Sequence, residues 1–204
     1  MIDISKQGDL WIVTLNRPEK ANSLTADMLK SLIDAARAAH GVAKAFVLTG
    51  EGKVFSAGAD LDAAKAGLAT SPLWEDLSGA LASLPCLTIC ALNGTLAGGA
   101  FGMALACDIR IADPGAKFFY PVMKLGFLPQ PSDPVRLASL IGPARAKMIL
   151  MAGQKIEADE ALEWGLVDRL VPAGDQMEAV AALAEHALGA SHAHIGSIKG
   201  LITQ

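Results

Sequence analysis

Short apolar runs bounded by turn residues recur along the chain and predict β-strands. The clearest of these runs lie at residues 10–15, 45–49, 88–92 and 108–112, and weaker ones at 117–120 and 167–171. Between the runs, apolar residues spaced three or four apart predict helices at 25–39, 74–84 and 174–189, with further helices from Asp133 onward. Strands that alternate with helices are typical of an α/β layered fold.

The helix predicted at 25–39 carries several independent signals. Thr25 suits the N-cap position, and Asp27 suits the positive end of the helix dipole in the first turn. The apolar residues then recur at helical spacing and define the buried face, which comprises Met28, Leu29, Leu32, Ile33 and Ala36.

The stretch from Leu84 to Cys107 contains no charged side chain and allows two interpretations. As one helix it is long enough to cross a bilayer, which takes roughly 20 apolar residues. The glycines at 94, 98 and 102 would then form a small-residue helix-pairing face. As a strand, a turn and a helix, the same stretch would be a buried strand that leads into a glycine-lined helix start.

The proline, turn and glycine residues of this stretch favour the second interpretation. Pro85 suits the start of a segment, and Asn93-Gly94 is a strong turn signal. Gly98-Gly99 suits a helix start where backbone approaches a ligand. Neither end is flanked by the cluster of Lys or Arg that marks a membrane helix.

Composition limits the classes of function. The chain has 204 residues, of which 52% are hydrophobic, and a net charge of −4 without a basic stripe. We therefore expect a core domain at residues 1–190, a short C-terminal tail at 191–204, and no binding to nucleic acid or membranes. The first residues lack the layout of a signal peptide, which predicts a cytoplasmic protein.

Cysteines and histidines give no metal-site pattern. Cys86, Cys90 and Cys107 all lie in the apolar stretch and are expected to be buried free thiols. His192 and His194 lie in the Gly/Ser-containing tail, two residues apart, without a third ligand nearby. Solvated tail histidines explain them better than a metal site.

Four segments, in order along the chain, carry a family resemblance. Residues 55–60 (FSAGAD) and 93–108 (NGTLAGGAFGMALACD) together resemble the enoyl-CoA hydratase/isomerase (crotonase) family. Residues 16–24 (NRPEKANSL) and the block 149–172, which includes ADEALEWGLV, are similar to the same family. The resemblance covers nearly the whole chain.

The resemblance implies a fold and a ligand. The fold is a spiral of β-β-α turns with small perpendicular sheets and surrounding helices, and family members usually continue well past residues 197–201, so the C-terminal helices look shortened here. The ligand is a coenzyme A thioester, so coenzyme A is part of the substrate and no permanently bound cofactor is expected. A homo-oligomer, typically a trimer, is also implied, although the short C-terminus puts it in question.

The resemblance further implies two backbone N–H donors that form an oxyanion hole, at positions matching Ala59 and Gly99. Gly99 would lie at a helix start, where unpaired N–H groups and the helix dipole favour negative charge. Without a Cβ it lets a thioester carbonyl come close. One such donor is worth roughly 3 kcal/mol in a transition state.

Other positions match residues that line the coenzyme A path in the family. These are Lys20, Ala21, Ala57, Asp60 and Leu61. Asp60 has a simpler explanation as the N-cap of the following short helix, whereas for Lys20 a solvated loop position explains it equally well.

Two catalytic positions depart from the family. Hydratases use two glutamates, one to activate water and one to protonate the α-carbon. The matching positions here are Gly102, three residues after Gly99, and Val122, after Pro121. Losing one positioned acid or base typically costs about 10²–10⁴ in rate, so hydratase activity is not expected.

Nearby polar residues are the remaining candidates. Gln130 follows the Leu125–Pro129 turn, where other family members place a polar residue; its amide can hydrogen-bond but cannot titrate. Asp133 is the nearest carboxylate, although N-capping explains it equally well. Tyr120 is a further candidate, and a core-edge tyrosine with a satisfied hydroxyl is the simpler interpretation.

These residues favour an enzyme that stabilises a thioester enolate. Decarboxylation of a malonyl-type thioester suits them, because loss of CO₂ generates the enolate without a base. Water or Asp133 would supply the proton that the enolate then needs. The alternative is a catalytically degenerate protein that binds acyl-CoA or serves as a subunit.

Overall fold

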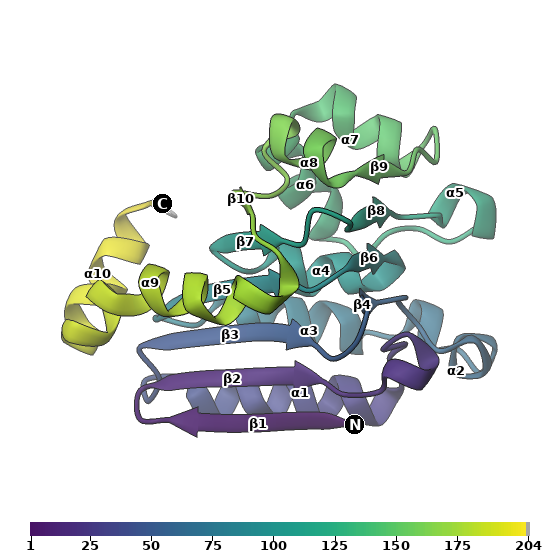
Figure 1. The fold of residues 1–204 in the computed structure, drawn as a ribbon. Helices are drawn as coiled ribbons and strands as arrows, with labels where there is room; N and C mark the ends of the chain where they lie inside the picture. Colours follow the sequence, from purple (N-terminus) through teal and green to yellow (C-terminus); the bar gives the residue numbers. More distant parts are fainter. Residues whose placement is uncertain (203–204) are drawn as a thin grey trace.

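The computed structural model describes residues 1–202, which form two sheets surrounded by helices (Figure 1). The larger sheet has six strands; strands β2 onward run parallel, and β1 is antiparallel to β2. Their spatial order is β1 (Ile2–Gln7), β2 (Leu10–Leu15), β3 (Ala45–Gly50), β5 (Leu87–Leu92), β7 (Ile109–Ala112) and β10 (Arg169–Leu170).

The smaller sheet has four strands, three of which directly follow a strand of the larger one. Its order is β4 (Val54–Ser56), β6 (Thr95–Ala97), β8 (Lys117–Phe119) and β9 (Ile156–Glu157). β3 leads into β4, β5 into β6, and β7 into β8, and a helical segment closes each turn. This is the predicted β-β-α spiral, and it places the ends of β4, β6 and β8 side by side.

Helices enclose both faces of the larger sheet and cap the smaller one (Figure 1). They are α1 (Ala26–Ala39), α2 (Leu61–Lys65), α3 (Leu73–Ala82), α4 (Phe101–Leu105), α5 (Val122–Leu125), α6 (Asp133–Ile141), α7 (Pro143–Leu150), α8 (Ala158–Trp164), α9 (Gln176–Gly189) and α10 (His192–Ile202). Short 3₁₀ turns are η1 (Pro18–Lys20), η2 (Leu68–Thr70), η3 (Gly98–Ala100) and η4 (Ala173–Asp175).

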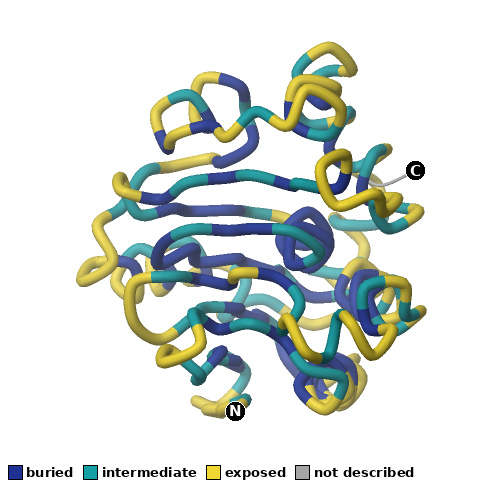
Figure 2. The backbone as a smooth tube through the Cα atoms, turned by 90° about the vertical axis from the view of Figure 1, so that its right-hand side faces the viewer, coloured by how far each residue is buried: buried dark blue, intermediate teal, exposed yellow. Residues whose placement is uncertain are grey.

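Strand β3 shows how the sheet is held on both faces. Phe46 and Leu48 belong to the large core, which also contains the buried faces of α1 and α3. Val47, of the opposite parity, packs in a second core with Val180 and Ala184 of α9. Figure 2 shows the buried segments concentrated in the strands at the centre of the molecule.

Most predicted elements are confirmed. The predicted strand at 10–15 is β2, and α1 begins after Thr25, whose side chain accepts from the Met28 N–H at 3.3 Å. Strand β1 was not predicted, because its residues after Ile2 are exposed and, apart from Ile4, polar, as suits an edge strand.

The C-terminal prediction needs a correction. Residues 191–204, predicted as a tail, include helix α10, while residues 203–204 lie outside the described part. Lys199 holds α10 to the sheet, because its Nζ donates to the Cys86 carbonyl at 3.0 Å and pairs with Asp108 at 2.8 Å. His192 and His194 are exposed, as predicted, but on a helix.

The uncharged stretch 84–107 divides into β5, β6, η3 and α4, so the strand-turn-helix interpretation is confirmed. Within residues 1–202 no helix is long and apolar enough to cross a membrane. Cys86, Cys90 and Cys107 are buried free thiols, as expected.

Candidate active site

A cavity of about 320 Å³ lies where the ends of β4, β6 and β8 meet the first turns that follow them. Four segments enclose it: the loop from Ala57 to Leu61, η3 with Gly98 and Gly99, the end of β8 with Phe119 and Tyr120, and α5 with the loop behind it. Apolar side chains dominate its wall, including Trp74, Val122, Leu125, Phe127 and Leu128.

Two glycines allow the first two of these loops to approach each other. A Cβ on Gly58 would lie 2.9 Å from the Ala97 carbonyl oxygen, and the φ of Gly58 is +88°. Gly98 has φ +58° and sends the chain from β6 into η3. Neither position suits a residue with a side chain. The close approach brings Ala59 and Gly99 to the same cavity wall.

Hydrogen bonds fix the direction of the Ala59 backbone. Leu24 donates its N–H to the Gly58 carbonyl at 2.8 Å and accepts from the Asp60 N–H at 2.9 Å. In such a parallel bridge the middle residue points its own N–H and C=O away from the partner. The Ala59 N–H therefore faces away from Leu24. Ser56 stiffens the same loop by donating to the Asn22 carbonyl at 2.9 Å.

Gly99 is the second residue of the helical segment η3–α4. The first N–H groups of such a segment have no intrahelical acceptor, so they are free to meet a ligand. The ring of Trp74 covers the Cα of Gly99, since a Cβ there would lie 3.2 Å from the indole. Trp74 is in turn fixed by its Nε1 donating to the Leu68 carbonyl at 2.8 Å.

The side chain of Asp133 lies directly against Gly102. A Cβ on Gly102 would lie 2.9 Å from Asp133 Oδ1. The carboxyl group of Asp133 thus fills the space beside α4 that a side chain at position 102 would enter. This explains why the absence of a side chain at 102 leaves no empty room there.

Asp133 is buried, with 1% of its surface exposed, and is the first residue of α6. The N-capping role considered for it is wrong, because Ser132 stands at the N-cap and the Asp133 carboxyl turns inward. Tyr120 donates its hydroxyl to Asp133 Oδ2 at 2.9 Å, whereas Oδ1 has no hydrogen-bond partner among the described residues.

The surroundings of Asp133 change its acidity. Burial raises the pKa of Asp133 to about 7, the hydrogen bond from Tyr120 opposes that rise, Glu75 adds to it, and Arg136 opposes it. Burial, followed by the Asp133 charge, raises the pKa of Tyr120 as well. A carboxyl that titrates near neutral pH beside a cavity is typical of an active-site acid or base.

A polar network behind the pair involves residues that the sequence did not single out. Glu75 Oε2 accepts from the Ser132 N–H at 3.2 Å and from its hydroxyl at 3.0 Å. Arg136 donates to the hydroxyls of Ser132 and Ser78, and Ser78 donates to the Gly102 carbonyl at 3.1 Å. The network ties α3, α4 and α6 together around Asp133.

The other candidates divide between the cavity and its surroundings. Ala57, Leu61 and Gln130 line the cavity, and the Gln130 N–H donates to the Tyr120 hydroxyl at 3.4 Å. Lys20 is exposed at the end of η1, and the carbonyl of its neighbour Ala21 accepts from the Ala57 N–H at 3.0 Å.

Asp60 has the capping role that the sequence suggested. Its Oδ1 accepts from the Asp62 and Ala63 N–H groups at 3.1 and 3.2 Å, at the start of α2. Its Oδ2 pairs with Arg17 at 2.8 Å. The bond from Ala63, above all, and that from Arg17 lower the pKa of Asp60. Its carboxylate is therefore engaged in holding the loop.

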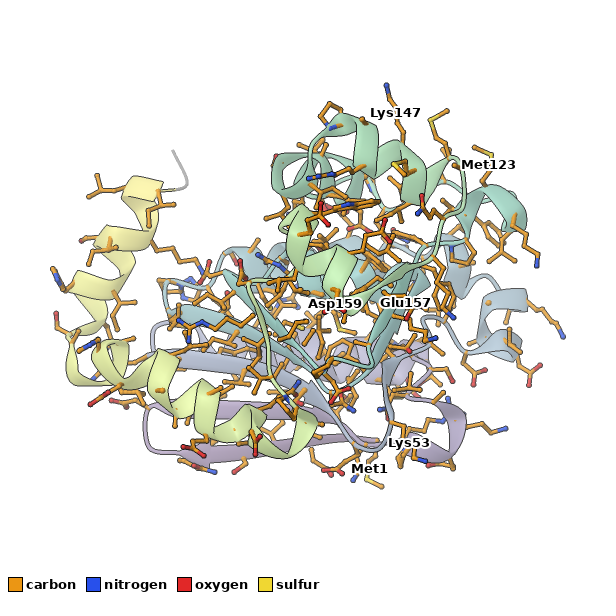
Figure 3. All side chains as sticks on the ribbon, turned by 45° about the horizontal axis from the view of Figure 1, so that its top comes forward. Met1, Lys53, Met123, Lys147, Glu157 and Asp159 are labelled. Atoms are coloured by element: carbon orange, nitrogen blue, oxygen red, sulfur yellow. The ribbon has the colours of Figure 1, made fainter. Side chains whose placement is uncertain are left out.

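A second, apolar groove of about 570 Å³ lies on the other side of α5, against α6 and α7. It shares Val122, Phe127 and Leu128 with the cavity, so α5 and the loop after it form the wall between the two. Figure 3 shows Met123 and Lys147 on the outer side of this helical layer.

The contact between Gly102 and Asp133 can be tested by a double-mutant cycle. Gly102→Ala is expected to lower the free energy of unfolding by about 1–3 kcal/mol, because the new methyl group must displace a carboxyl that Tyr120 holds. In an Asp133→Ala background the same change should cost less, with a coupling energy of about 1–3 kcal/mol from urea titrations.

Gly79→Ala is the matched control for this cycle. Gly79 lies in α3, and a Cβ there would meet nothing within 4 Å. Alanine should therefore stabilise the helix by about 1 kcal/mol. An equal cost of Gly102→Ala with and without Asp133 would show that the two residues do not compete for space.

Comparison with known proteins agrees with this architecture. Residues 5–203 match the Enoyl-CoA hydratase/isomerase family. The chain belongs to this family, and its fold is the crotonase fold.

Individual relatives span the chain. It is 36% identical over 182 residues to the short-chain-enoyl-CoA hydratase of Clostridium acetobutylicum, which covers 85% of this chain and 70% of that protein. The structure of enoyl-CoA hydratase from Bacillus anthracis superposes with a TM-score of 0.91 at 30% identity, covering 100% of this chain and 82% of that one. The structure of Pseudomonas aeruginosa DspI gives 0.90 at 33% identity, covering 98% and 85%.

Proposed function

We propose that this protein is an enzyme that acts on an acyl-CoA thioester by stabilising its enolate, in a reaction other than hydration. The observation that carries the proposal is the meeting of Ala59 and Gly99 at one cavity wall. Their two N–H groups form an oxyanion hole for the thioester oxygen. Preorganised donors of this kind act where charge develops, in a site from which water is excluded.

Coenzyme A would approach along the loops on the β4 side of the cavity. Ala57 and Leu61 line the cavity, Ala21 is bonded to Ala57, and Lys20 is exposed beside them. These positions suit the pantetheine arm, with the Lys20 ammonium near the nucleotide phosphates. Asp60 supports the same loop through its cap and its ion pair with Arg17.

Hydration is disfavoured by the residues that surround the cavity. It needs one group to activate water and another to protonate the α-carbon, and positions 102 and 122 are a glycine and a valine. The carboxyl of Asp133, which lies beside Gly102, is buried and hydrogen-bonded to Tyr120.

Decarboxylation of a malonyl-type thioester is the reaction that these residues suit best. The bond between the α-carbon and the carboxylate breaks, CO₂ leaves, and the electron pair becomes the enolate held by Ala59 and Gly99. No base is required for that step. The apolar wall favours it, because an anionic carboxylate loses solvation there while the enolate oxygen finds donors.

A panel of thioesters tests this function. Purified protein is incubated with malonyl-, methylmalonyl- and enoyl-CoA, and products are read by mass spectrometry, while calorimetry measures binding of unreactive acyl-CoA. We expect conversion of a malonyl-type member and no hydration of the enoyl member. Binding without any turnover would favour the alternative, a catalytically degenerate acyl-CoA-binding or subunit protein. Gel filtration would show whether a trimer forms.

A further inference from the structure

Tyr120 at the cavity wall is hydrogen-bonded to the buried carboxyl of Asp133. We propose that Tyr120 and Asp133 form a proton relay for the thioester α-carbon, in which Tyr120 exchanges the proton with the substrate and Asp133 with Tyr120. The inference rests on the proposed function, because it supplies the proton that an enolate held by Ala59 and Gly99 needs.

The order of the two groups follows from their burial. Tyr120 lines the cavity together with Ala59 and Gly99, so part of its side chain borders the space that a ligand would occupy. Asp133 does not line the cavity and is 1% exposed. The 2.9 Å hydrogen bond between the Tyr120 hydroxyl and Asp133 Oδ2 joins them. Asp133 therefore reaches the substrate through the tyrosine.

The Tyr120 side chain is held in one orientation. Its ring stacks on Phe101, with centroids 5.3 Å apart and planes at 25°. Its hydroxyl oxygen also accepts from the Gln130 N–H at 3.4 Å. A fixed ring keeps the hydroxyl at a constant distance from both Asp133 and the cavity, which proton transfer requires.

A purely structural role explains Asp133 poorly. A buried carboxylate is ordinarily paired with a cation or fully hydrogen-bonded, yet Asp133 Oδ1 has no partner among the described residues. The nearby cation, Arg136, donates instead to Ser132 and Ser78. An oxygen without a partner leaves the carboxylate anion less stabilised, which favours the protonated form whose proton Oδ2 can share with Tyr120.

The proton balance of the relay is simple. After CO₂ has left, the enolate α-carbon takes the Tyr120 hydroxyl proton and a C–H bond forms. Tyr120 recovers a proton from the Asp133 carboxylic acid, and Asp133 recovers one from solvent. One proton enters and one CO₂ leaves in each cycle. In reverse, an α-proton passes to Tyr120 while the Tyr120 proton passes to ionised Asp133.

Hydrogen exchange at the α-carbon tests the relay without requiring decarboxylation. Butyryl-CoA is incubated with the protein in D₂O, and deuterium at the α-carbon is followed by mass spectrometry. Exchange is expected with the wild type, and Tyr120→Phe and Asp133→Asn should each lower its rate by about 10²–10⁴. Asp34→Asn, at an exposed position on α1, is the matched control and should leave the rate unchanged.

The pH profile distinguishes a relay from a scaffold. The groups that face Asp133 are Tyr120 from the end of β8, Glu75 from α3 and Arg136 on α6. Exchange should rise through about pH 7 as Asp133 ionises and becomes able to accept the Tyr120 proton. The residual exchange of Asp133→Asn should show no such rise. A merely structural Asp133 would leave the profile unshifted.

A second measurement needs no activity at all. The chain contains one tyrosine, so ¹³Cζ-labelled tyrosine gives a single NMR resonance, that of Tyr120. Its shift should follow a titration near pH 7 in the wild type and be flat in Asp133→Asn. A flat wild-type resonance would overturn the relay.

The two proposals can fail separately. Turnover or exchange that Tyr120→Phe and Asp133→Asn leave unchanged would overturn the relay and keep the proposed function. Absence of both turnover and exchange in a protein that binds acyl-CoA would overturn the proposed function, and the relay with it.

Discussion

Replacing the Gly99 amide by an ester is expected to lower kcat/KM on the converted thioester by about 10²–10³. Incorporating glycolic acid at position 99 exchanges the N–H for an oxygen and adds no side chain. The loss should fall mainly on kcat, because the donor meets charge that develops only as the enolate forms. Steady-state kinetics on the active member of the thioester panel measures it.

The ester is preferable to a proline at this position, because any Cβ on Gly99 would lie 3.2 Å from the Trp74 ring. Gly99→Ala is therefore a useful control: it keeps the N–H and introduces only the steric conflict. A loss in the ester that clearly exceeds the loss in the alanine variant assigns the effect to the N–H rather than to packing against Trp74. If the ester retains full activity, Gly99 is not a donor.

Asp133→Asn is expected to make the protein more stable at alkaline pH while it slows catalysis. The wild type must keep a carboxylate away from water above neutral pH, because the pKa of Asp133 is raised from 3.8 to about 7 in the folded protein. Asparagine has no charge to bury, and its carbonyl oxygen can still accept from Tyr120. Active-site residues often lower the stability of the folded protein while they support its activity.

The direction of the pH effect follows from proton binding. Between pH 3.8 and about 7 the folded wild type holds a proton that the unfolded chain releases, so its stability falls as pH rises through this window. Above about pH 7 the loss is complete. The free energy of unfolding of Asp133→Asn, relative to that of the wild type, should thus increase by about 3 kcal/mol between about pH 4.5 and 8.5.

Urea unfolding at several pH values measures this difference. The Asp34→Asn variant, at an exposed position on α1, is the control for the loss of one carboxyl group. If the difference in the free energy of unfolding between Asp133→Asn and the wild type does not change with pH, the Asp133 carboxyl is not shielded from water in solution.

Local sequence signals predicted the part of the site that depends on local geometry. The turn at 93–94 and the glycine pair at 98–99 marked the strand end and the helix start beside Gly99, while the donor roles of Ala59 and Gly99 came from the family resemblance and stay predictions. The capping role of Asp60 was readable for the same reason, since an N-cap acts within three residues of its own position.

The rest of the site depends on contacts between distant segments. Asp133 looked like a helix cap because sequence reports that it precedes a helix but not which way its carboxyl turns. Its neighbours are Tyr120, thirteen residues earlier, and Gly102, on another turn of the spiral. The one local hint was Gly102 itself, whose missing side chain signalled space for something else.

The contact between Gly102 and Asp133 also affects how this active site could evolve by substitution. A glutamate at position 102 would have to displace the carboxyl of Asp133, which stands 2.9 Å from the point where that side chain would begin. Removing Asp133 first leaves the Tyr120 hydroxyl without its acceptor. Each single step is unfavourable in the background of the other, so the two residues form an epistatic pair. Conversion toward a hydratase would need the changes at 102 and 133 together, and an acid at position 122, where the chain has Val122, as well.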